Sequence, residues 1–136
     1  LKSFVIEEAR LVVTRASGVL KLQDLEENRA ALLADPAFDP GYDHLFDLRG
    51  TASFAFPTED VEKATSVRAF SETSRRAVVA PGDLAFGLAR MYGSQRADLS
   101  ETIRVFRELD RALEWLNRNP EDPCLRALRA AQPPEG

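Results

Sequence analysis

Residues of the types that catalyse reactions or bind metals are scarce in this sequence. His44 is its only histidine and Cys124 its only cysteine. With one histidine, we expect neither a multi-histidine metal site nor a catalytic triad. Asp43 precedes His44, which predicts a surface histidine beside a carboxylate, and Cys124 is interpreted as an incidental thiol. We therefore predict no catalytic residue, no metal ligand and no cofactor.

Two glycines have the spacing of a phosphate-binding loop. Gly82 and Gly87 are separated by four residues, but such a loop continues with Lys and then Ser or Thr. Leu88 and Ala89 stand there instead, and Asp83 would repel a phosphate at the start of the following helix. The spacing is therefore interpreted as a plain strand-to-helix turn.

A carboxylate and a guanidinium group flank the expected end of a strand. Asp47 and Arg49 could bind a ligand there, or they could form hydrogen bonds with the loop expected at residues 50–53, which is the interpretation we favour. Phe54 and Phe56 follow at alternate positions, so an extended segment would point both rings to one side. The two rings then face either the core, which we favour, or a partner.

Phe86 lies on a predicted helix, away from the apolar stripe of that helix. It is about 200° around the helix from Leu84 and in line with Arg90. An aromatic ring at this position either fills a seam with a neighbouring helix or belongs to a patch that meets another molecule. The candidate ligand or partner surface near the carboxyl ends of the strands comprises Asp47, Arg49, Phe54, Phe56, Leu84, Phe86 and Arg90.

The composition limits the class of protein. The chain has 136 residues, of which 44% are hydrophobic and 29% charged, with a formal net charge of −4. This length fits one domain, placed over residues 1–119, with residues 120–136 as a tail that is a short helix or frayed. The negative charge argues against nucleic-acid binding, and no apolar run is long enough for a transmembrane helix. Because no signal peptide is recognised either, we expect a cytoplasmic protein.

Alternating strands and helices must position the candidate residues. β-branched and aromatic runs predict a hairpin of strands at residues 4–6 and 11–14. The spacing of leucines predicts a helix over residues 22–34, and Thr58 and Asp83 are expected to cap the next two helices. Further elements are expected as strands at residues 44–48, 76–80 and 102–106 and as a last helix from Leu109 to near Asn119.

This order of elements predicts the α/β class. Strands separated by helices imply right-handed crossovers and a largely parallel sheet. We expect five strands, with an antiparallel strand at the amino terminus, and four main helices. In such sheets ligands bind beyond the carboxyl ends of the parallel strands, so the regions of interest are residues 47–56, 80–86 and those from Arg107 onward.

Several runs of the sequence resemble a bacterial group of small SpoIIAA-like proteins of unknown function, which are related to STAS and CRAL-TRIO domains. The matching runs are ALLADP at 31–36, FDP at 38–40, FDLR at 46–49, RRAVVAP at 75–81, LAFGLARMY at 84–92, VFR at 105–107 and ALEWL at 112–116. The resemblance covers most of the chain from Gly18 to Leu116. It implies a right-handed superhelix of four strand–helix units preceded by an antiparallel strand.

The related domains differ in what they imply for function. STAS anti-sigma antagonists are switched by phosphorylation of a serine that follows an aspartate after the third strand. Ala55 and Phe56 stand where that pair is expected, so the switch residue is missing, and Thr58 is the nearest hydroxyl but is expected to cap a helix. The CRAL-TRIO relationship implies a small apolar ligand pocket, with a mouth formed by Phe54, Phe56, Leu84 and Phe86.

We therefore predict a non-enzymatic protein-binding or signalling module that uses this surface to bind a protein partner or to self-associate as a homodimer. The alternative is a carrier of a small apolar or acyl ligand. An enzyme is the third hypothesis, because acid–base chemistry would have to use a carboxylate such as Asp47 or Asp83. Neither nucleic-acid binding nor integral membrane association is expected.

Overall fold

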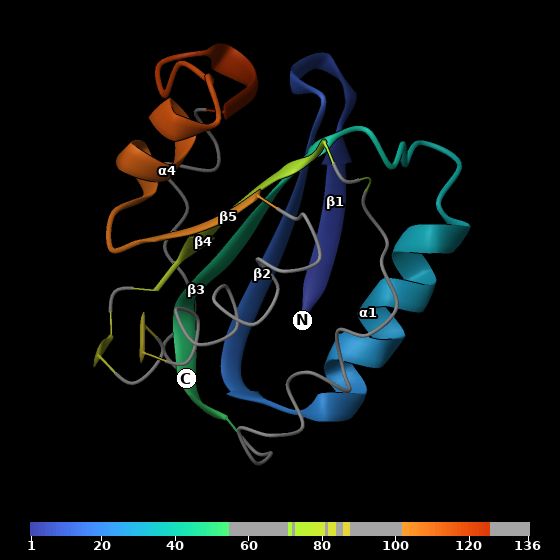
Figure 1. Ribbon diagram of the computed structural model, residues 1–136. Helices are drawn as coiled ribbons and strands as arrows, with labels where there is room; N and C mark the ends of the chain where they lie inside the picture. Colours follow the sequence, from blue (N-terminus) through green and yellow to red (C-terminus); the bar gives the residue numbers. More distant parts are fainter. Residues whose placement is uncertain (55–70, 72, 81, 84–85, 88–101, 126–136) are drawn as a thin grey trace.

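The computed structural model describes residues 1–54, 71, 73–80, 82, 83, 86, 87 and 102–125, which form a sheet with helices on both sides (Figure 1). The strands are β1 (Lys2–Ile6), β2 (Leu11–Leu20), β3 (Asp43–Phe54), β4 (Arg75–Val79) and β5 (Thr102–Phe106). The helices are the short 3₁₀ segment η1 (Glu7–Ala9), α1 (Leu22–Ala34) and α4 (Leu109–Trp115).

The five strands lie in the sheet in the order in which they occur in the sequence. β1 pairs with β2 in the antiparallel direction, and the pairs β2–β3, β3–β4 and β4–β5 are parallel. η1 closes the hairpin between β1 and β2, and Arg10 after it takes a left-handed conformation with a φ of 50°. The predicted mixed sheet with an antiparallel first strand is confirmed.

Most of the predicted elements are present. α1 and β5 have the predicted bounds, and β4 is displaced by one residue toward the amino terminus. α4 begins at Leu109 as predicted but ends at Trp115, since Asn117 takes a left-handed conformation with a φ of 61°. Three helical segments are described where four main helices were expected. The helix predicted to begin at Thr58 lies outside the described residues, and so does most of the helix predicted to begin at Asp83.

β3 is much longer than the predicted strand of residues 44–48, which corrects the prediction of a loop over residues 50–53. The polar residues and the glycine that follow Leu48 have little intrinsic preference for strands. Pairing with β2 decides their conformation instead, because Ser17 pairs with Gly50 and Leu20 with Phe54. The ten-residue β2 is paired with β3 over almost all of its length, which satisfies the backbone groups on the facing edges of both strands.

Side chains that alternate along the strands build a core on each face of the sheet. On one face Val13, Leu45 and Val79 are buried together with Leu113 of α4. Leu125 is buried in the same cluster, so the segment after α4 packs against the domain as far as this residue. The division into a domain of residues 1–119 and a tail stays a prediction.

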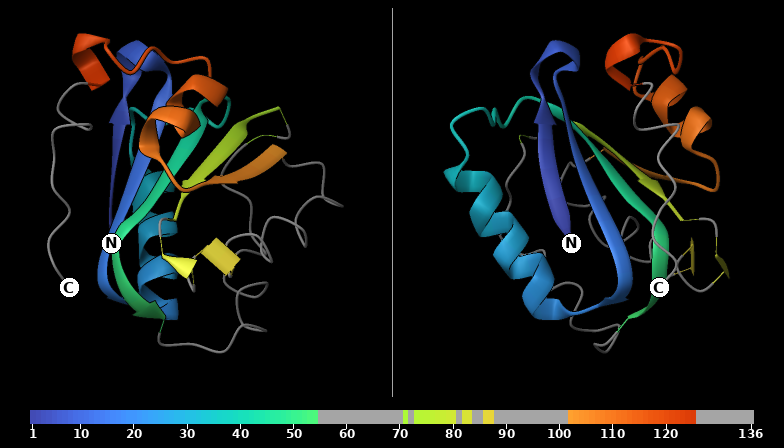
Figure 2. Two further views of the ribbon diagram at one scale, coloured as in Figure 1. Left: turned by 90° about the vertical axis from the view of Figure 1, so that its left-hand side faces the viewer. Right: turned by 180° about the vertical axis from the view of Figure 1, so that it is seen from behind.

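The other face of the sheet packs against α1. Val12 of β2 is buried against Leu32 of α1, and further along the same face Leu20 and Val78 pack with Leu25. Figure 2 shows α1 and α4 on opposite sides of the sheet. The described residues therefore form the three layers that are typical of α/β folds.

Arg118 ties the segment after α4 to the amino-terminal end of the parallel strands. Its Nε donates a hydrogen bond to the carbonyl oxygen of Ala9 over 2.7 Å, and its Nη2 donates to that of Arg10 over 2.9 Å. Its Nη1 donates to the Asp43 carboxylate over 3.1 Å and also to the carbonyl oxygen of Leu116. A guanidinium group offers five N–H donors in a fixed geometry, and here it joins three separate segments.

Replacement of Arg118 with alanine is expected to lower the free energy of unfolding by about 2 to 3 kcal/mol, because hydrogen bonds from a charged donor are lost and part-buried acceptors stay unsatisfied. Urea denaturation followed by circular dichroism measures the change. Arg111→Ala is the matched control, because Arg111 and its ion-pair partner Glu108 are both exposed, and it should change this free energy by less than about 0.5 kcal/mol. Equal losses in the two variants would contradict the role of Arg118.

Candidate functional site

The described part of the predicted surface is centred on the carboxylate of Asp47, which is only 2% exposed. Arg49 donates two parallel hydrogen bonds to it, from Nε to Oδ1 and from Nη2 to Oδ2, each 2.9 Å long. The backbone N–H of Arg49 also donates to Oδ1 over 3.0 Å. Arg15 of β2 is the second cation, with its Nε 3.5 Å from Oδ2. Asp47 thus binds two arginines, and we call this group the Arg15–Asp47–Arg49 cluster; the predicted hydrogen bonds to residues 50–53 stay a prediction.

The register of the strands brings this cluster together. Arg15 and Asp47 pair directly across β2 and β3. Beyond them β2 advances two residues, to Ser17, while β3 advances three, to Gly50, so β3 carries a bulge that includes Arg49. Bulges redirect side chains and are frequent beside functional sites. The sequence pattern had singled out Asp47 and Arg49 but not Arg15, because a partner across strands is known only once the register is known.

A pocket of about 330 Å³ adjoins the cluster. Its walls are formed by Leu1, Lys2, Phe4, Arg15, Ala16, Ser17 and Asp47. Lys2 pairs with Arg15 across β1 and β2, so the two cationic side chains lie on the same face of the sheet. The volume lies near the lower end of the range for small-molecule sites, which begins at roughly 300 Å³.

His44 is buried, which corrects the prediction of a surface histidine beside Asp43. Its side chain is 6% exposed, and Nε2 lies 2.8 Å from Oγ1 of Thr14. The Asp43 carboxylate accepts hydrogen bonds from the backbone N–H of Arg75 and from the side chain of Arg118. Successive side chains of a strand point to opposite faces, so Asp43 and His44 lie on different sides of the sheet.

A chain of three hydrogen bonds links His44 to α1. Oγ of Ser3 donates to Oδ1 of Asn28 over 2.7 Å, so its proton is engaged there, and Thr14 must donate in the 2.6 Å bond between the two hydroxyls. The hydroxyl of Thr14 therefore accepts from Nε2–H of His44. Because donation runs from the imidazole toward the helix, His44 is not placed to take a proton from either hydroxyl.

The surroundings of His44 also keep its ring neutral. Burial lowers the pKa of His44 well below the usual value of 6.5, and the positive charge of Arg76 lowers it further. A neutral imidazole is therefore built into the core between the sheet and α1.

Cys124 lies in a setting that suppresses its reactivity. Its Sγ donates to Oδ1 of Asp122 over 3.2 Å, and this hydrogen bond raises the pKa of the thiol from 9.0. The thiolate is the nucleophilic form of cysteine. The arrangement agrees with the interpretation of Cys124 as an incidental thiol.

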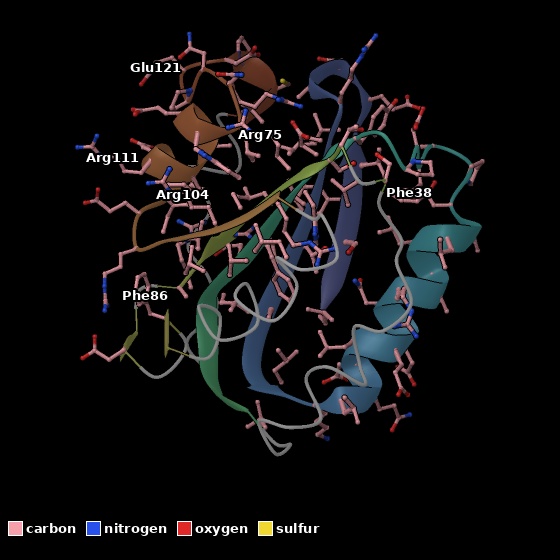
Figure 3. The ribbon with its side chains drawn as sticks, viewed as in Figure 1. Phe38, Arg75, Phe86, Arg104, Arg111 and Glu121 are labelled. Carbon is pink, nitrogen blue, oxygen red and sulfur yellow. The ribbon has the colours of Figure 1, made fainter. Side chains whose placement is uncertain are left out.

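Phe86 lies at the carboxyl-terminal end of β4 and β5, beside an arginine that follows β5. The guanidinium group of Arg107 is 4.2 Å from the centre of the Phe86 ring and forms a 3.0 Å ion pair with Asp83. The ring is half-buried and packs in part against the core of the α1 face. Figure 3 shows Phe86 at the periphery of the molecule, away from α1. One side of the Phe86 ring thus packs against the core and another contacts a surface cation; its contact with another molecule stays a prediction.

Two more arginines lie over aromatic rings nearby, and the sequence pattern had not grouped them with Phe86. Arg75 is 4.3 Å from the centre of the Trp115 ring, and Arg104 is 5.8 Å from that of Phe106. The rings of Phe106 and Trp115 are 5.7 Å apart, and Figure 3 shows Arg75 and Arg104 beside α4. Phe106 and Trp115 pack against the core of the α4 face and Phe86 against that of the α1 face, so these side chains lie around the edge of the sheet formed by β5. We call this set the arginine–aromatic surface: Arg75, Phe86, Arg104, Phe106, Arg107 and Trp115.

The remaining predicted surface residues are placed only in part. Phe54 is the last residue of β3 and pairs with Leu20. Phe56, Leu84 and Arg90 lie outside the described residues. Within the described part of the chain, no group of three or more His, Cys, Asp or Glu side chains is arranged to bind a metal ion. No helix in the same part is long and apolar enough to cross a membrane.

Comparison with known proteins identifies the fold. No protein-family model matches the sequence, and no curated protein matches it. Among solved structures, the chain is similar to that of an uncharacterized protein from the DUF3478 family with a SpoIIAA-like fold from Shewanella loihica PV-4. The TM-score is 0.56 at 20% sequence identity, and the match covers 78% of this chain and 83% of the other. The chain therefore has a SpoIIAA-like fold, as the sequence resemblance implied.

The neutral, buried His44 predicts a loss of stability in mild acid. The unfolded chain takes up a proton at this residue near pH 6.5, whereas the folded chain resists it. The free energy of unfolding should therefore decrease as the pH falls below about 6.5, by at most about 1.4 kcal/mol per pH unit. Urea denaturation at a series of pH values measures the slope. His44→Gln, which keeps a side-chain donor and does not titrate, should have a shallower slope, and identical slopes would rule out His44 as the group responsible.

The hydrogen bond of Cys124 predicts that Asp122→Asn makes the thiol more reactive. The substitution removes the carboxylate that raises the pKa of the thiol, so more thiolate is present at neutral pH. Mass spectrometry of a time course with iodoacetamide should show a several-fold faster alkylation. Glu121→Gln is the control, because it removes the neighbouring charge and leaves the hydrogen bond in place. If Asp122→Asn reacts no faster than this control, the hydrogen bond does not govern the thiol.

Proposed function

We propose that this SpoIIAA-like domain is a non-enzymatic protein-binding module that self-associates through its arginine–aromatic surface. The observation that carries the proposal is the contact of 4.2 Å between the Arg107 guanidinium and the half-buried ring of Phe86. This contact lies beyond the carboxyl ends of β4 and β5, and that is the edge at which sheets of this class bind other molecules.

The residue types on this surface support a role in protein binding. Arginine and the large aromatic residues are enriched in protein interfaces and among the side chains that contribute most to affinity. Arg75, Arg104 and Arg107 each lie over an aromatic ring. A cation held over a ring has fewer rotamers to lose when a partner binds, so the entropic cost of association is lower.

Charges of both signs on and around the surface favour a second copy of the chain as the partner. Arg107 pairs with Asp83, and Arg111 of α4 pairs with Glu108. All four side chains are exposed. In a two-fold interface each surface meets its own image, so an arginine of one copy can bind a carboxylate of the other. A surface that carries charges of one sign would repel the same surface of a second copy, whereas a surface with both signs can complement it.

The settings of the titratable groups support binding rather than catalysis. A general acid or base must exchange a proton with a substrate within hydrogen-bond reach. The imidazole of His44 is buried and donates to Thr14, and the pKa of the Cys124 thiol is raised. Both oxygens of Asp47 accept hydrogen bonds from Arg49. These three groups are therefore engaged in structural interactions.

The alternative function, a carrier of a small apolar or acyl ligand, receives less support from the pockets that the described residues line. The pocket of about 330 Å³ contains Lys2, Arg15 and Asp47. Another, of about 360 Å³, lies between β1 and α1 and contains Asp24 and Glu27. Pockets for apolar molecules are lined mainly by apolar side chains, so these walls favour charged or polar ligands.

Phe86→Glu is the test of self-association. The wild-type protein should behave in light scattering as a dimer, with twice the 15.1 kDa mass of one chain, and the variant should behave as a monomer, because a buried carboxylate at the centre of an interface is strongly unfavourable. Leu33→Glu is the matched control, because Leu33 is an exposed apolar residue on α1, and Phe86 lies at the periphery away from that helix (Figure 3). A monomeric wild-type protein would contradict the proposal, and so would an unchanged dimer in a correctly folded Phe86→Glu variant.

A further inference from the structure

The Arg15–Asp47–Arg49 cluster leaves Arg15 with an incomplete set of partners. Both oxygens of Asp47 already accept hydrogen bonds of 2.9 Å from Arg49. Nε of Arg15 is 3.5 Å from Oδ2, longer than the roughly 2.7 to 2.9 Å of a charge-assisted hydrogen bond. Nη2 of Arg15 is buried and has no hydrogen-bond partner among the described residues. A charged donor in this state is unfavourable unless another acceptor is bound nearby.

Lys2 adds to the positive charge around Arg15. It pairs with Arg15 across β1 and β2, and like charges directly opposite each other on neighbouring strands destabilise the pair. Lys2 and Arg15 thus bring two positive charges to the pocket that Asp47 also lines, and the Asp47 carboxylate already accepts two hydrogen bonds from Arg49. This local excess is notable in a chain whose formal net charge is −4.

The pocket beside this excess charge has room for a ligand. Its volume is about 330 Å³, and Lys2 and Arg15 both line it. The side chain of Arg15 is 27% exposed. Ser17 contributes a hydroxyl group to the wall, whereas Phe4 and Ala16 contribute apolar surface. Cationic donors beside a low-polarity wall strengthen the attraction for a negative charge, because the effective dielectric constant is lower than in water.

We propose that this pocket binds a small oxyanion, a phosphate or a carboxylate group, through Arg15 and Lys2. A guanidinium group binds either anion with two parallel N–H···O hydrogen bonds, and a lysine adds a point charge. Asp47 and Arg49 are positioning residues, because they hold Arg15 at the wall through the ion pair and the β3 bulge. The bound negative charge would also relieve the repulsion between Lys2 and Arg15. This site is independent of the arginine–aromatic surface and of the proposed self-association.

The test is a titration of the intact protein with inorganic phosphate and, separately, with acetate, at an ionic strength held constant with sodium chloride. Isothermal titration calorimetry measures affinity, and the midpoint of thermal unfolding should rise with anion concentration, because the ligand binds the folded state. Saturable binding of at least one anion is expected, and the anion that binds more tightly identifies the oxyanion class.

Two variants and one control make the result specific. Arg15→Gln is expected to weaken binding by about tenfold or more, because a charged hydrogen-bond donor is lost. Lys2→Gln, at an exposed position of β1, should weaken it less and does not disturb the cluster. Arg10→Gln, which removes an exposed arginine between β1 and β2 that does not line the pocket, should bind as the wild type does. The proposal is overturned if the wild type shows no saturable binding of either anion, or if Arg15→Gln and Lys2→Gln both bind as tightly as Arg10→Gln.

Discussion

The backbone hydrogen bonding of β2 is the constraint on which the rest of the structure depends. From Leu11 to Arg15 β2 is paired on both sides, with β1 in the antiparallel direction and with β3 in the parallel direction, and from Ser17 to Leu20 it is paired with β3. A buried strand leaves very few N–H and C=O groups unpaired, so β3 continues with β2 past Asp47, the position that pairs with Val79 at the end of β4. The long β2–β3 pair carries the Arg15–Asp47–Arg49 cluster and its bulge. The same strand, through Thr14, also fixes the imidazole of His44.

The two faces of the sheet accommodate buried polar groups in different ways. On the α1 face the groups are neutral, and hydrogen bonds join His44, Thr14 and Ser3 without a counter-charge. On the opposite face Asp47 is a carboxylate, and burial of a charge demands an opposite charge close by. Arg49 meets this demand with two parallel hydrogen bonds. Arg15 and Lys2 add positive charge beyond that of Arg49. This added charge makes this end of the sheet a candidate binding site.

The sequence predicts elements well where local and tertiary signals agree. Leu22–Ala34 and Thr102–Phe106 have the predicted bounds, because their apolar spacing and the packing of the sheet favour the same conformation. The part of β3 after Leu48 has weak local signals, and only the pairing with β2 makes it a strand. The same limit applies to the site. The burial of His44 depends on a bond to a residue 30 positions away, and the place of Arg15 depends on a register in which a shift of one residue would move it to the other face.

The bonds of Arg118 bear on how long the folded domain persists. They join residues that are 108 and 109 positions apart in the chain. Contacts between such distant residues form only after much of the intervening chain is ordered, because the entropy of loop closure must be overcome first. Interactions that are absent from the folding transition state slow unfolding and leave the folding rate almost unchanged. We therefore expect Arg118 to contribute mainly to the lifetime of the native state, and less to the speed at which the chain reaches it.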